Sequence, residues 1–305
     1  MKRLKLLWLI LAFAASGVTI LAVTRFWLDE PAGEQKDRVS NSAQAGPMPA
    51  IPAAGMFEQR ALDRLLAAHV DEAGQVDYVG LARERAALDA YLATLTKAAP
   101  DSFRSDDERL AFWINAYNAY TLRDVLDDVY GKAQSVKAVP GFFDKKRHAV
   151  AGHELTLDEI EGRARKFRDP RIHFAVNCAS ASCPKLQRFA YAGAELQAQL
   201  DRVTQEFLAD PVRGMRLDKE RNRIYLSSLF KWYAGDFTGS SNKVGRALAI
   251  AKAVVSGDDV RDYVRERVAP DIGQYIRERR PDVKYLDYDW SLNAQEAYDA
   301  KAEGK

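Results

Sequence analysis

The sequence predicts an α+β fold, in which one mostly helical globular domain with a small sheet follows an N-terminal transmembrane helix. Apolar residues recur at helical spacing through most of the chain beyond residue 56. The few predicted strands do not alternate regularly with the helices, which disfavours a doubly wound sheet. The first 28 residues contain a long apolar run without charges, next to basic residues.

The N-terminal segment is predicted to anchor the chain in a membrane. Residues 6–23 form an uncharged run of 18 residues, about the minimum length that spans a bilayer. Basic residues precede the run and Asp29 and Glu30 follow it, so the positive-inside rule places the remaining chain outside the cytoplasm. A cleaved signal peptide is the alternative, because Ala12-Phe13-Ala14 resembles a cleavage site. Both interpretations export the domain, and we expect a single-pass protein of the inner membrane with its globular domain in the periplasm.

Four segments follow from the composition along the chain. Residues 30–55 are rich in Pro, Ala, Gly and Ser and lack periodicity, so they bury too little apolar surface to offset the entropy of ordering. We expect them to be a flexible tether. The predicted segments are the anchor at 1–28, the linker at 29–55, the globular domain at 56–295 and a polar tail at 296–305.

The N-terminal half of the domain is predicted to be mainly helical, because its apolar residues recur at helical spacing. Pro100 ends the first helical unit. Asp106 or Asp107 can cap the long helix that follows, which Gly131 closes. The elements expected here are helices at 57–70, 81–95 and 106–130 and an extended segment at 76–79.

The C-terminal half is predicted to mix short strands with helices. A hairpin is expected around residues 219–222, with arms at 216–217 and 223–226. The other elements expected here are strands or extended segments at 154–157, 171–177 and 284–289 and helices at 158–167, 195–208, 258–268 and 271–279.

The long helix carries the first group of candidate site residues. Its uncharged stretch at 110–122 covers all faces, so we expect the helix to be buried at the centre of the domain. Trp113 lies on one face, and Asn115 and Asn118 share another. A buried amide without partners costs about 1–3 kcal/mol, so both must bond to backbone groups, water or a ligand. They either tie the helix to a neighbouring loop, which is the favoured interpretation, or line a cleft.

A second group follows the predicted strand at 171–177. Strand alternation directs its apolar residues to the core and His173 and Asn177 to the opposite face. The small residues that come next, Ser180 among them, end at Pro184 and form a tight polar loop, which is a common place for a site.

Cys178 and Cys183 are the only cysteines of the chain. Two close cysteines in an oxidising compartment favour a disulfide, and a reactive thiol or a pair of inert buried thiols are the alternatives. A thiol nucleophile needs a base within hydrogen-bond reach. In a strand His173 would lie about 16 Å from Cys178, so a histidine from elsewhere would have to supply that base.

A third group lies in the aromatic stretch at 225–237. Its aromatic side chains are expected to belong to the core, and Asp236 is the one acid there that could face a cleft. The basic run at 163–171 is expected to be a solvated helix face, although Arg171 could lie on the same side as His173.

The charge distribution argues against nucleic-acid binding. The net charge is +2, but the first 27 residues hold four basic residues and no acid, so the remaining chain carries −2. A nearly neutral body has no field to hold a polyanion. Zinc is a poor fit because no second paired motif supplies ligands, and no metal or other cofactor is expected.

Several of these motifs together carry a family resemblance. They lie at 112–118, 155–161, 169–180, 183–184, 232–233, 236–237 and 288–293. The chain resembles the Domain of Unknown Function 547 family, found in bacteria and in plant proteins with an N-terminal leucine zipper, over residues 57–293. The Asn-Cys-Ala-Ser…Cys-Pro element is its most specific motif, and Gly162 is a departure, since the family pattern often has His after Ile-Glu. The resemblance implies a single domain and supplies no established reaction.

Two functional hypotheses follow. The favoured one is a membrane-anchored domain that binds an extracytoplasmic ligand or partner in a polar-aromatic cleft. The alternative is a thiol-dependent hydrolase or acyltransferase with Cys178 as the nucleophile. The candidate binding residues are Trp113, Asn115, Asn118, Arg171, His173, Asn177, Ser180 and Asp236.

Overall fold

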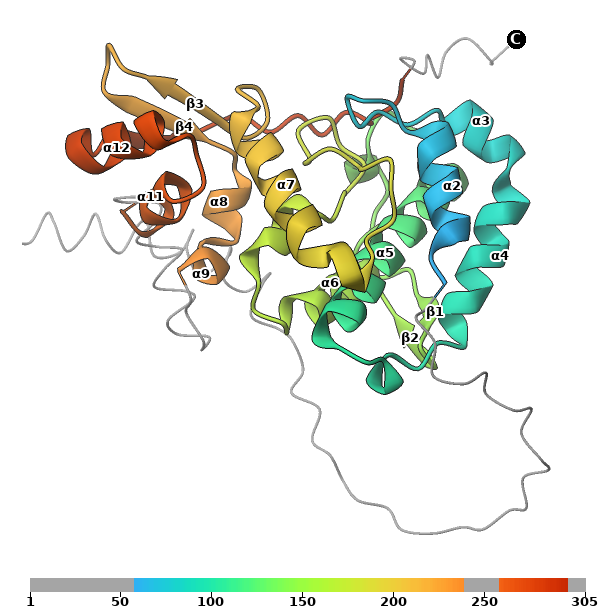
Figure 1. Ribbon diagram of the computed structural model, residues 1–305. Helices are drawn as coiled ribbons and strands as arrows, with labels where there is room; N and C mark the ends of the chain where they lie inside the picture. Colours follow the sequence, from blue (N-terminus) through green and yellow to red (C-terminus); the bar gives the residue numbers. More distant parts are fainter. Residues whose placement is uncertain (1–57, 239–257, 296–305) are drawn as a thin grey trace, which may run out of the picture.

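The computed structural model describes residues 58–238 and 258–295 (Figure 1). The predicted anchor at 1–28, linker at 29–55 and tail at 296–305 lie outside the described residues. Within the described part of the chain, no helix combines the length and the hydropathy that a bilayer span requires.

The described residues form helices and two small sheets, which confirms the α+β class. The longer helices are α2 (Arg60–His69), α3 (Tyr78–Arg83), α4 (Arg85–Thr96), α5 (Asp106–Asp124), α6 (Leu157–Arg165), α7 (Leu196–Ala209), α11 (Asp258–Arg265) and α12 (Pro270–Arg279). The short ones are α8 (Leu229–Trp232) and α9 (Ala234–Phe237), the π-helix η2 (Val125–Val129), and the 3₁₀ helices η1 (Pro100–Ser102), η3 (Val136–Ala138), η4 (Pro170–Phe174) and η5 (Gly193–Glu195).

The strands form one hairpin and one three-stranded sheet. β1 (His148–Val150) pairs antiparallel with β2 (His153–Leu155). The other sheet has the order β3 (Met215–Asp218), β4 (Arg223–Leu226), β5 (Asp282–Tyr285), with β3 and β4 antiparallel and β4 and β5 parallel. Figure 1 shows β3 and β4 at one end of the molecule, beside α11 and α12.

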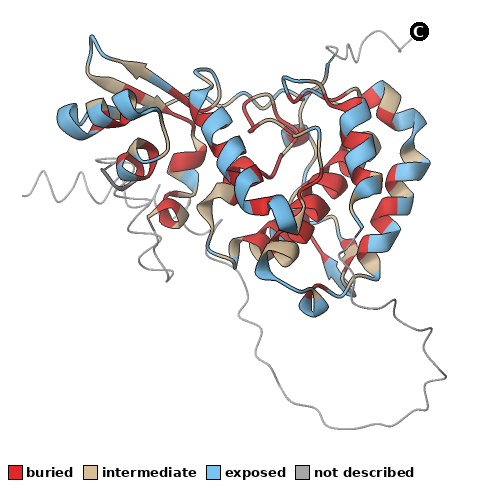
Figure 2. Ribbon diagram, in the orientation of Figure 1, coloured by how far each residue is buried: buried red, intermediate tan, exposed pale blue. Residues whose placement is uncertain are grey.

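Helix α5 is buried at the centre of the domain, as its uncharged stretch predicts. Its residues from Leu110 to Leu122 are all buried, and Figure 2 shows the helix enclosed by its neighbours. The N-cap is Ser105, whose Oγ accepts a hydrogen bond from the Glu108 N–H at 3.1 Å. The predicted cap at Asp106 or Asp107 is therefore wrong. Those acids lie in the first turn, where carboxylates stabilise the positive end of the helix dipole.

The predicted strand at 171–177 is wrong, because this segment begins as the 3₁₀ helix η4. The Asp169 carboxylate accepts a hydrogen bond from the Arg171 N–H at 3.0 Å, and Pro170 supplies a helical φ at the first position. Ile172, His173 and Phe174 are consequently all buried rather than alternating between two faces.

Two other predicted elements differ in their bounds. The Asp77 carboxylate accepts from the Gly80 N–H at 2.8 Å, so α3 already begins at Tyr78. The extended segment predicted at 76–79 is reduced to the bridges of Val76 with Val70 and Ala294. The single helix predicted at 81–95 is two helices, since Glu84 interrupts it. The hairpin and the later helices agree with prediction to within about three residues at each end.

Candidate active site

The cysteine loop, residues 177–184, is held in shape by Asn177. Its Nδ2 donates to the Pro184 carbonyl at 2.7 Å, and its Oδ1 accepts from the Ala179 N–H at 2.9 Å. Ala179 adopts a left-handed conformation with φ of 60°, which a small side chain tolerates at modest cost. One amide therefore closes the loop around the two cysteines.

The C-terminal segment clamps the same loop from outside. The Ala181 N–H donates to the Ser291 carbonyl at 2.8 Å, and the Asn293 N–H donates to the Ala179 carbonyl at 3.3 Å. This clamp delivers Tyr288 to the site, although 110 residues separate it from Cys178.

Cys178 is half-buried, and hydrogen-bond donors surround its sulfur. Its Sγ lies 2.8 Å from Cys183 Sγ, 3.0 Å from Ser180 Oγ and 3.4 Å from Tyr288 Oη, and the Ser180 backbone N–H also reaches it. Burial alone would raise the pKa of Cys178, but these bonds stabilise the thiolate and lower the pKa to about 7. A large share of the Cys178 side chain is therefore ionised at neutral pH.

Cys183 has the opposite character. It is 4% exposed, and its sulfur accepts a hydrogen bond from the Cys178 N–H at 3.0 Å. Burial raises the pKa of Cys183 well above its ordinary value, and the neighbouring Cys178 thiolate raises it further. Both residues are free thiols in the structure. The site thus pairs a half-buried sulfur that is partly ionised at neutral pH with a buried, protonated one.

A polar cluster is formed by the buried residues Glu161 and His173 and the half-buried residues Arg165, Tyr233 and Asp236. The Asp236 carboxylate accepts from Arg165 Nε at 2.7 Å and lies 2.9 Å from His173 Nε2. Burial would raise the pKa of Asp236, but these two partners lower it. Burial lowers the pKa of His173 although Asp236 opposes the shift, so the imidazole is held neutral with the proton on Nε2. His173 and Asp236 therefore form a hydrogen-bonded pair that Arg165 supports.

Glu161 is the unusual member of that cluster. Its side chain is buried on α6 and lies 3.4 Å from Tyr233 Oη. Burial raises the pKa of Glu161 to about 7, although Arg165 opposes the shift. A carboxyl group with such a pKa can gain or lose a proton at neutral pH, which is a property of functional sites.

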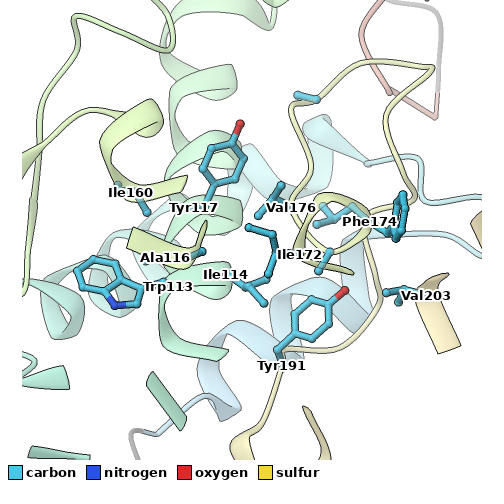
Figure 3. Close-up of a cluster of buried hydrophobic side chains, with 14 of the residues drawn as sticks. Trp113, Ile114, Ala116, Tyr117, Ile160, Ile172, Phe174, Val176, Tyr191 and Val203 are labelled. Carbon is cyan, nitrogen blue, oxygen red and sulfur yellow. The ribbon is translucent and has the colours of Figure 1, made fainter. Parts of the chain in front are cut away.

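Tyr117 is a buried tyrosine of α5. Figure 3 shows its ring on α5, between Ile160 of α6 and Val176 of the segment that leads to the cysteine loop, with the hydroxyl directed away from the apolar cluster. Burial raises the pKa of Tyr117, and the negative charges of Glu161 and of Cys178 raise it further. The charges of the carboxyl and of the thiol therefore both disfavour ionisation of the Tyr117 hydroxyl.

An aromatic rim, formed by Trp232, Tyr288 and Trp290, lies beside Cys178. The ring centroids of Trp232 and Tyr288 are 4.9 Å apart, and those of Tyr288 and Trp290 are 4.7 Å apart. Trp232 is exposed, and Lys137 Nζ lies 4.7 Å from the Trp290 ring. Among the described residues, Tyr288 is the only member of the rim that makes a polar contact with the Cys178 sulfur.

The predicted site residues divide into two sets. The structure brings Asn177 and Ser180 together at the cysteine loop, and His173 and Asp236 together in the polar cluster. Asn115 instead exchanges two hydrogen bonds with the Tyr191 backbone, at 2.8 and 2.9 Å.

The remaining three also lie outside the loop. Asn118 bonds to the Ala175 carbonyl at 3.0 Å and to the Asn177 N–H at 2.8 Å. Arg171 pairs with Asp169 and Asp201, and Trp113 is buried with Arg163 over its ring. The two asparagines thus tie α5 to loops.

Four residues of the site were not among the predicted site residues. Glu161, Tyr233 and Tyr288 lie within the family motifs at 155–161, 232–233 and 288–293, and Arg165 belongs to the basic run that was expected to be a solvated helix face. The helical spacing of Glu161 and Arg165, four residues apart on the buried side of α6, is the signal that could have identified the pair. A Cβ at Gly162 would meet no atom within 4 Å, so packing does not require glycine there.

The space behind the loop is too small for a substrate. A polar cavity of about 40 Å³, lined in part by Asn177, Cys183 and Asn293, has room for about two or three water molecules. Cys178 is therefore the sulfur that a substrate can reach. In the ranges that the structure describes, no group of three or more His, Cys, Asp or Glu side chains is placed to hold a metal ion.

Comparison with known proteins agrees with the motifs. No curated protein matches the chain, and no solved structure matches it. Residues 100–208 match the family described as Protein of unknown function, DUF547, and this segment contains α5, α6 and the whole cysteine loop. This match confirms the resemblance to the DUF547 family over residues 100–208.

Proposed function

We propose that this domain carries out thiol–disulfide exchange, with Cys178 as the attacking thiol and Cys183 as the resolving thiol. The observation that carries the proposal is the pair itself, with Sγ atoms 2.8 Å apart, one half-buried and ionised and the other buried and protonated. A movement of less than about 1 Å would bring the sulfurs to the length of a disulfide bond.

The exchange has two steps. The Cys178 thiolate attacks one sulfur of a substrate disulfide, forms a mixed disulfide and releases the first substrate thiolate, which takes a proton from water. Cys183 then loses its proton and attacks Cys178 Sγ, so that the intrachain disulfide forms and the second substrate thiolate leaves. Two electrons pass from the protein to the substrate, and the reverse reaction with a dithiol restores the two cysteines.

The aromatic rim is the proposed binding surface for that substrate. Trp232 and Trp290 offer large, partly exposed faces beside Cys178, and aromatic rings of this kind contribute strongly to binding. This surface differs from the polar-aromatic cleft expected from the sequence, which did not include Trp232 or Trp290. In this proposal the substrate binds to the rim and reacts at the Cys178 sulfur.

The proposed location is outside the cytoplasm, with the N-terminal segment as a single-pass anchor. The charge pattern around residues 6–23 supports this orientation, and disulfides form and persist in oxidising compartments. A reporter enzyme active only in the periplasm, fused to the C-terminal end, is expected to be active. A silent reporter would overturn the location while leaving the chemistry open.

A thiol-dependent hydrolase or acyltransferase with Cys178 as the nucleophile is the second candidate. The low pKa of Cys178 favours it, because an ionised thiol attacks a carbonyl without a neighbouring base. Such an enzyme would leave Cys183 without a chemical role. The two candidates therefore differ in what Cys183→Ser does.

The experiment uses an aromatic disulfide, 5,5′-dithiobis(2-nitrobenzoate), and counts the coloured thiolates released. The reduced wild-type domain is expected to release two and to end with an intrachain disulfide. Cys183→Ser is expected to release one and to retain the other as a mixed disulfide. At pH 7 the first release is expected to be roughly five- to eightfold faster than from an unfolded cysteine, because the larger thiolate fraction outweighs its lower nucleophilicity.

Cys178→Ser is the matched control, and its buried Cys183 is expected to react more slowly than the wild-type pair. If the wild-type domain retained the aromatic group as Cys183→Ser does, Cys183 would not be a resolving thiol. That outcome would overturn the exchange function and support acyl transfer.

A further inference from the structure

The hydroxyl groups of Ser180 and Tyr288 form a triangle of polar contacts with the Cys178 sulfur. Ser180 Oγ lies 3.0 Å and Tyr288 Oη 3.4 Å from Cys178 Sγ, and the two oxygens are 3.1 Å apart. Ser180 is buried and Tyr288 is half-buried, so little water competes for these contacts. A hydroxyl proton rotates to suit its partner, so both groups can donate to the sulfur when it is charged.

The backbone fixes both hydroxyls in place. The Asp289 N–H donates to Ser182 Oγ at 2.9 Å, and the Ser182 N–H donates to the Asp289 carbonyl at 3.1 Å. Ser180 and Leu292 form an antiparallel bridge. The neighbour of Tyr288 is thus bonded in both directions to the loop that carries Ser180. The triangle is therefore built by two backbone segments and does not depend on the side chains alone.

The strength of the contacts depends on the oxidation state of Cys178. A thiolate is a charged acceptor, and hydrogen bonds to charged acceptors are about twice as strong as those between neutral groups. The sulfur of a thiol is only a weak acceptor, and a disulfide sulfur has no charge to attract a hydroxyl. The two hydroxyls therefore stabilise the reduced pair more than the oxidised pair. A couple whose reduced form is stabilised in this way is a stronger oxidant.

Cys178 is the sulfur whose charge changes near neutral pH. Burial alone would raise its pKa, but the hydrogen bonds at the sulfur lower the pKa to about 7. For each titratable group that interacts with it among the described residues, burial holds the pKa above the ordinary value, so these groups stay protonated when Cys178 ionises. They are Cys183 of the same loop, Tyr288 of the C-terminal segment, Tyr78 of α3, Tyr117 of α5 and Tyr233 after α8.

We propose that the hydroxyls of Ser180 and Tyr288 hold Cys178 as a thiolate and thereby bias the cysteine pair toward its reduced form. This inference rests on the proposed exchange function. Reduction of the Cys178–Cys183 bond by a dithiol transfers two electrons to the pair, and the dithiol becomes a disulfide. One of the two protons that the dithiol loses stays on Cys183, and the other passes to water where Cys178 is ionised. The bias therefore favours a dithiol substrate, which leaves oxidised.

Tyr288→Phe tests the proposal, because it removes the hydroxyl and keeps the ring. The variant and the wild type are equilibrated with reduced and oxidised glutathione at pH 6 and pH 9, and their thiols are alkylated and counted by mass spectrometry. Loss of one hydrogen bond to a charged group is expected to lower the acid ionisation constant of Cys178 about tenfold. The equilibrium constant for oxidation of the pair is then expected to rise about ninefold at pH 9 and less than about 1.2-fold at pH 6.

The rate of alkylation of Cys178 by iodoacetamide gives an independent readout. The pH at which this rate reaches half its plateau is expected to move from about 7 in the wild type to about 8 in Tyr288→Phe. Ser180→Ala is expected to shift both measurements in the same direction. Tyr225→Phe, which removes the hydroxyl of a half-buried tyrosine of β4, is the matched control and is expected to change neither.

The outcomes separate this proposal from the exchange function. Equal equilibrium constants for Tyr288→Phe and the wild type at pH 9 would overturn the proposal and leave the exchange function standing. A change of the same size at pH 6 and pH 9 would do so too, because it would show an effect of packing and not of the thiolate. A wild-type domain that keeps glutathione on Cys178 and forms no intrachain disulfide would instead overturn the exchange function.

Discussion

Between pH 4.5 and pH 7, the free energy of unfolding of the wild-type domain is expected to fall by about 3 kcal/mol because Glu161 ionises. The variant Glu161→Gln is expected not to show this fall. The pKa of Glu161 is raised from 4.5 to about 7 in the folded state, and each unit of difference corresponds to about 1.4 kcal/mol. The folded state therefore holds a proton that the unfolded chain releases. Stability from the protonated acid is complete below pH 4.5 and is lost as the pH rises through 7.

Urea unfolding of reduced protein at several pH values measures this effect. The free energy of unfolding of Glu161→Gln minus that of the wild type is expected to increase by about 3 kcal/mol from pH 4 to pH 8. Glu154→Gln, which changes an exposed glutamate, serves as the matched control and is expected to follow the wild type. Parallel curves for Glu161→Gln and wild type would show that Glu161 ionises normally in the folded domain.

The variant Asn118→Ala is expected to lower the free energy of unfolding by about 2–4 kcal/mol. The Asn118 amide donates to the Ala175 carbonyl and accepts from the Asn177 N–H, and the side chain is 3% exposed. Alanine would leave both backbone groups without their partner in the core, and each unsatisfied group costs about 1–3 kcal/mol. Since Asn177 shapes the cysteine loop, the first thiolate release by Cys178 is also expected to slow.

The control for Asn118→Ala is Ser102→Ala, which removes one local hydrogen bond at an exposed position. We expect it to change the free energy of unfolding by less than about 0.5 kcal/mol. If Asn118→Ala melted like Ser102→Ala, the amide would not tie α5 to the cysteine loop. The burial of its polar side chain in the core would then need another explanation, such as a ligand contact.

Much of the fold could be predicted because its signals are local. The burial of α5 follows from the absence of charge at 110–122, and the hairpin of β3 and β4 follows from turn residues between two apolar runs. The strand predicted at 171–177 failed because the Asp169 cap and Pro170 outweigh the alternating pattern. The N-cap of Asp169 thus favours a 3₁₀ helix over a strand in a segment whose apolar residues alternate as in a strand.

The site could be predicted only in part because its chemistry depends on distant segments. The motif identified Cys178, Cys183, Asn177 and Ser180, which lie within a few residues of one another. Tyr288 reaches Cys178 only because the C-terminal segment crosses the loop. No local pattern contains that information, and the ionisation of Cys178 depends on it.

The disulfide expected from the sequence and the free thiols of the structure are two states of one pair in this account. An oxidised pair would protect Cys178 from substrate, while a reduced pair would be competent to attack. The function then depends on how readily the two states interconvert.

A redox titration of the purified domain tests this most directly. The protein is equilibrated with dithiothreitol at defined ratios of reduced to oxidised form, and its thiols are alkylated and counted by mass spectrometry. The account predicts that Cys178 and Cys183 lose their thiols together, gain an intrachain disulfide and recover both thiols when the ratio is reversed. Two thiols that stay alkylatable at every ratio, or oxidation of Cys178 while Cys183 stays a thiol, would contradict it.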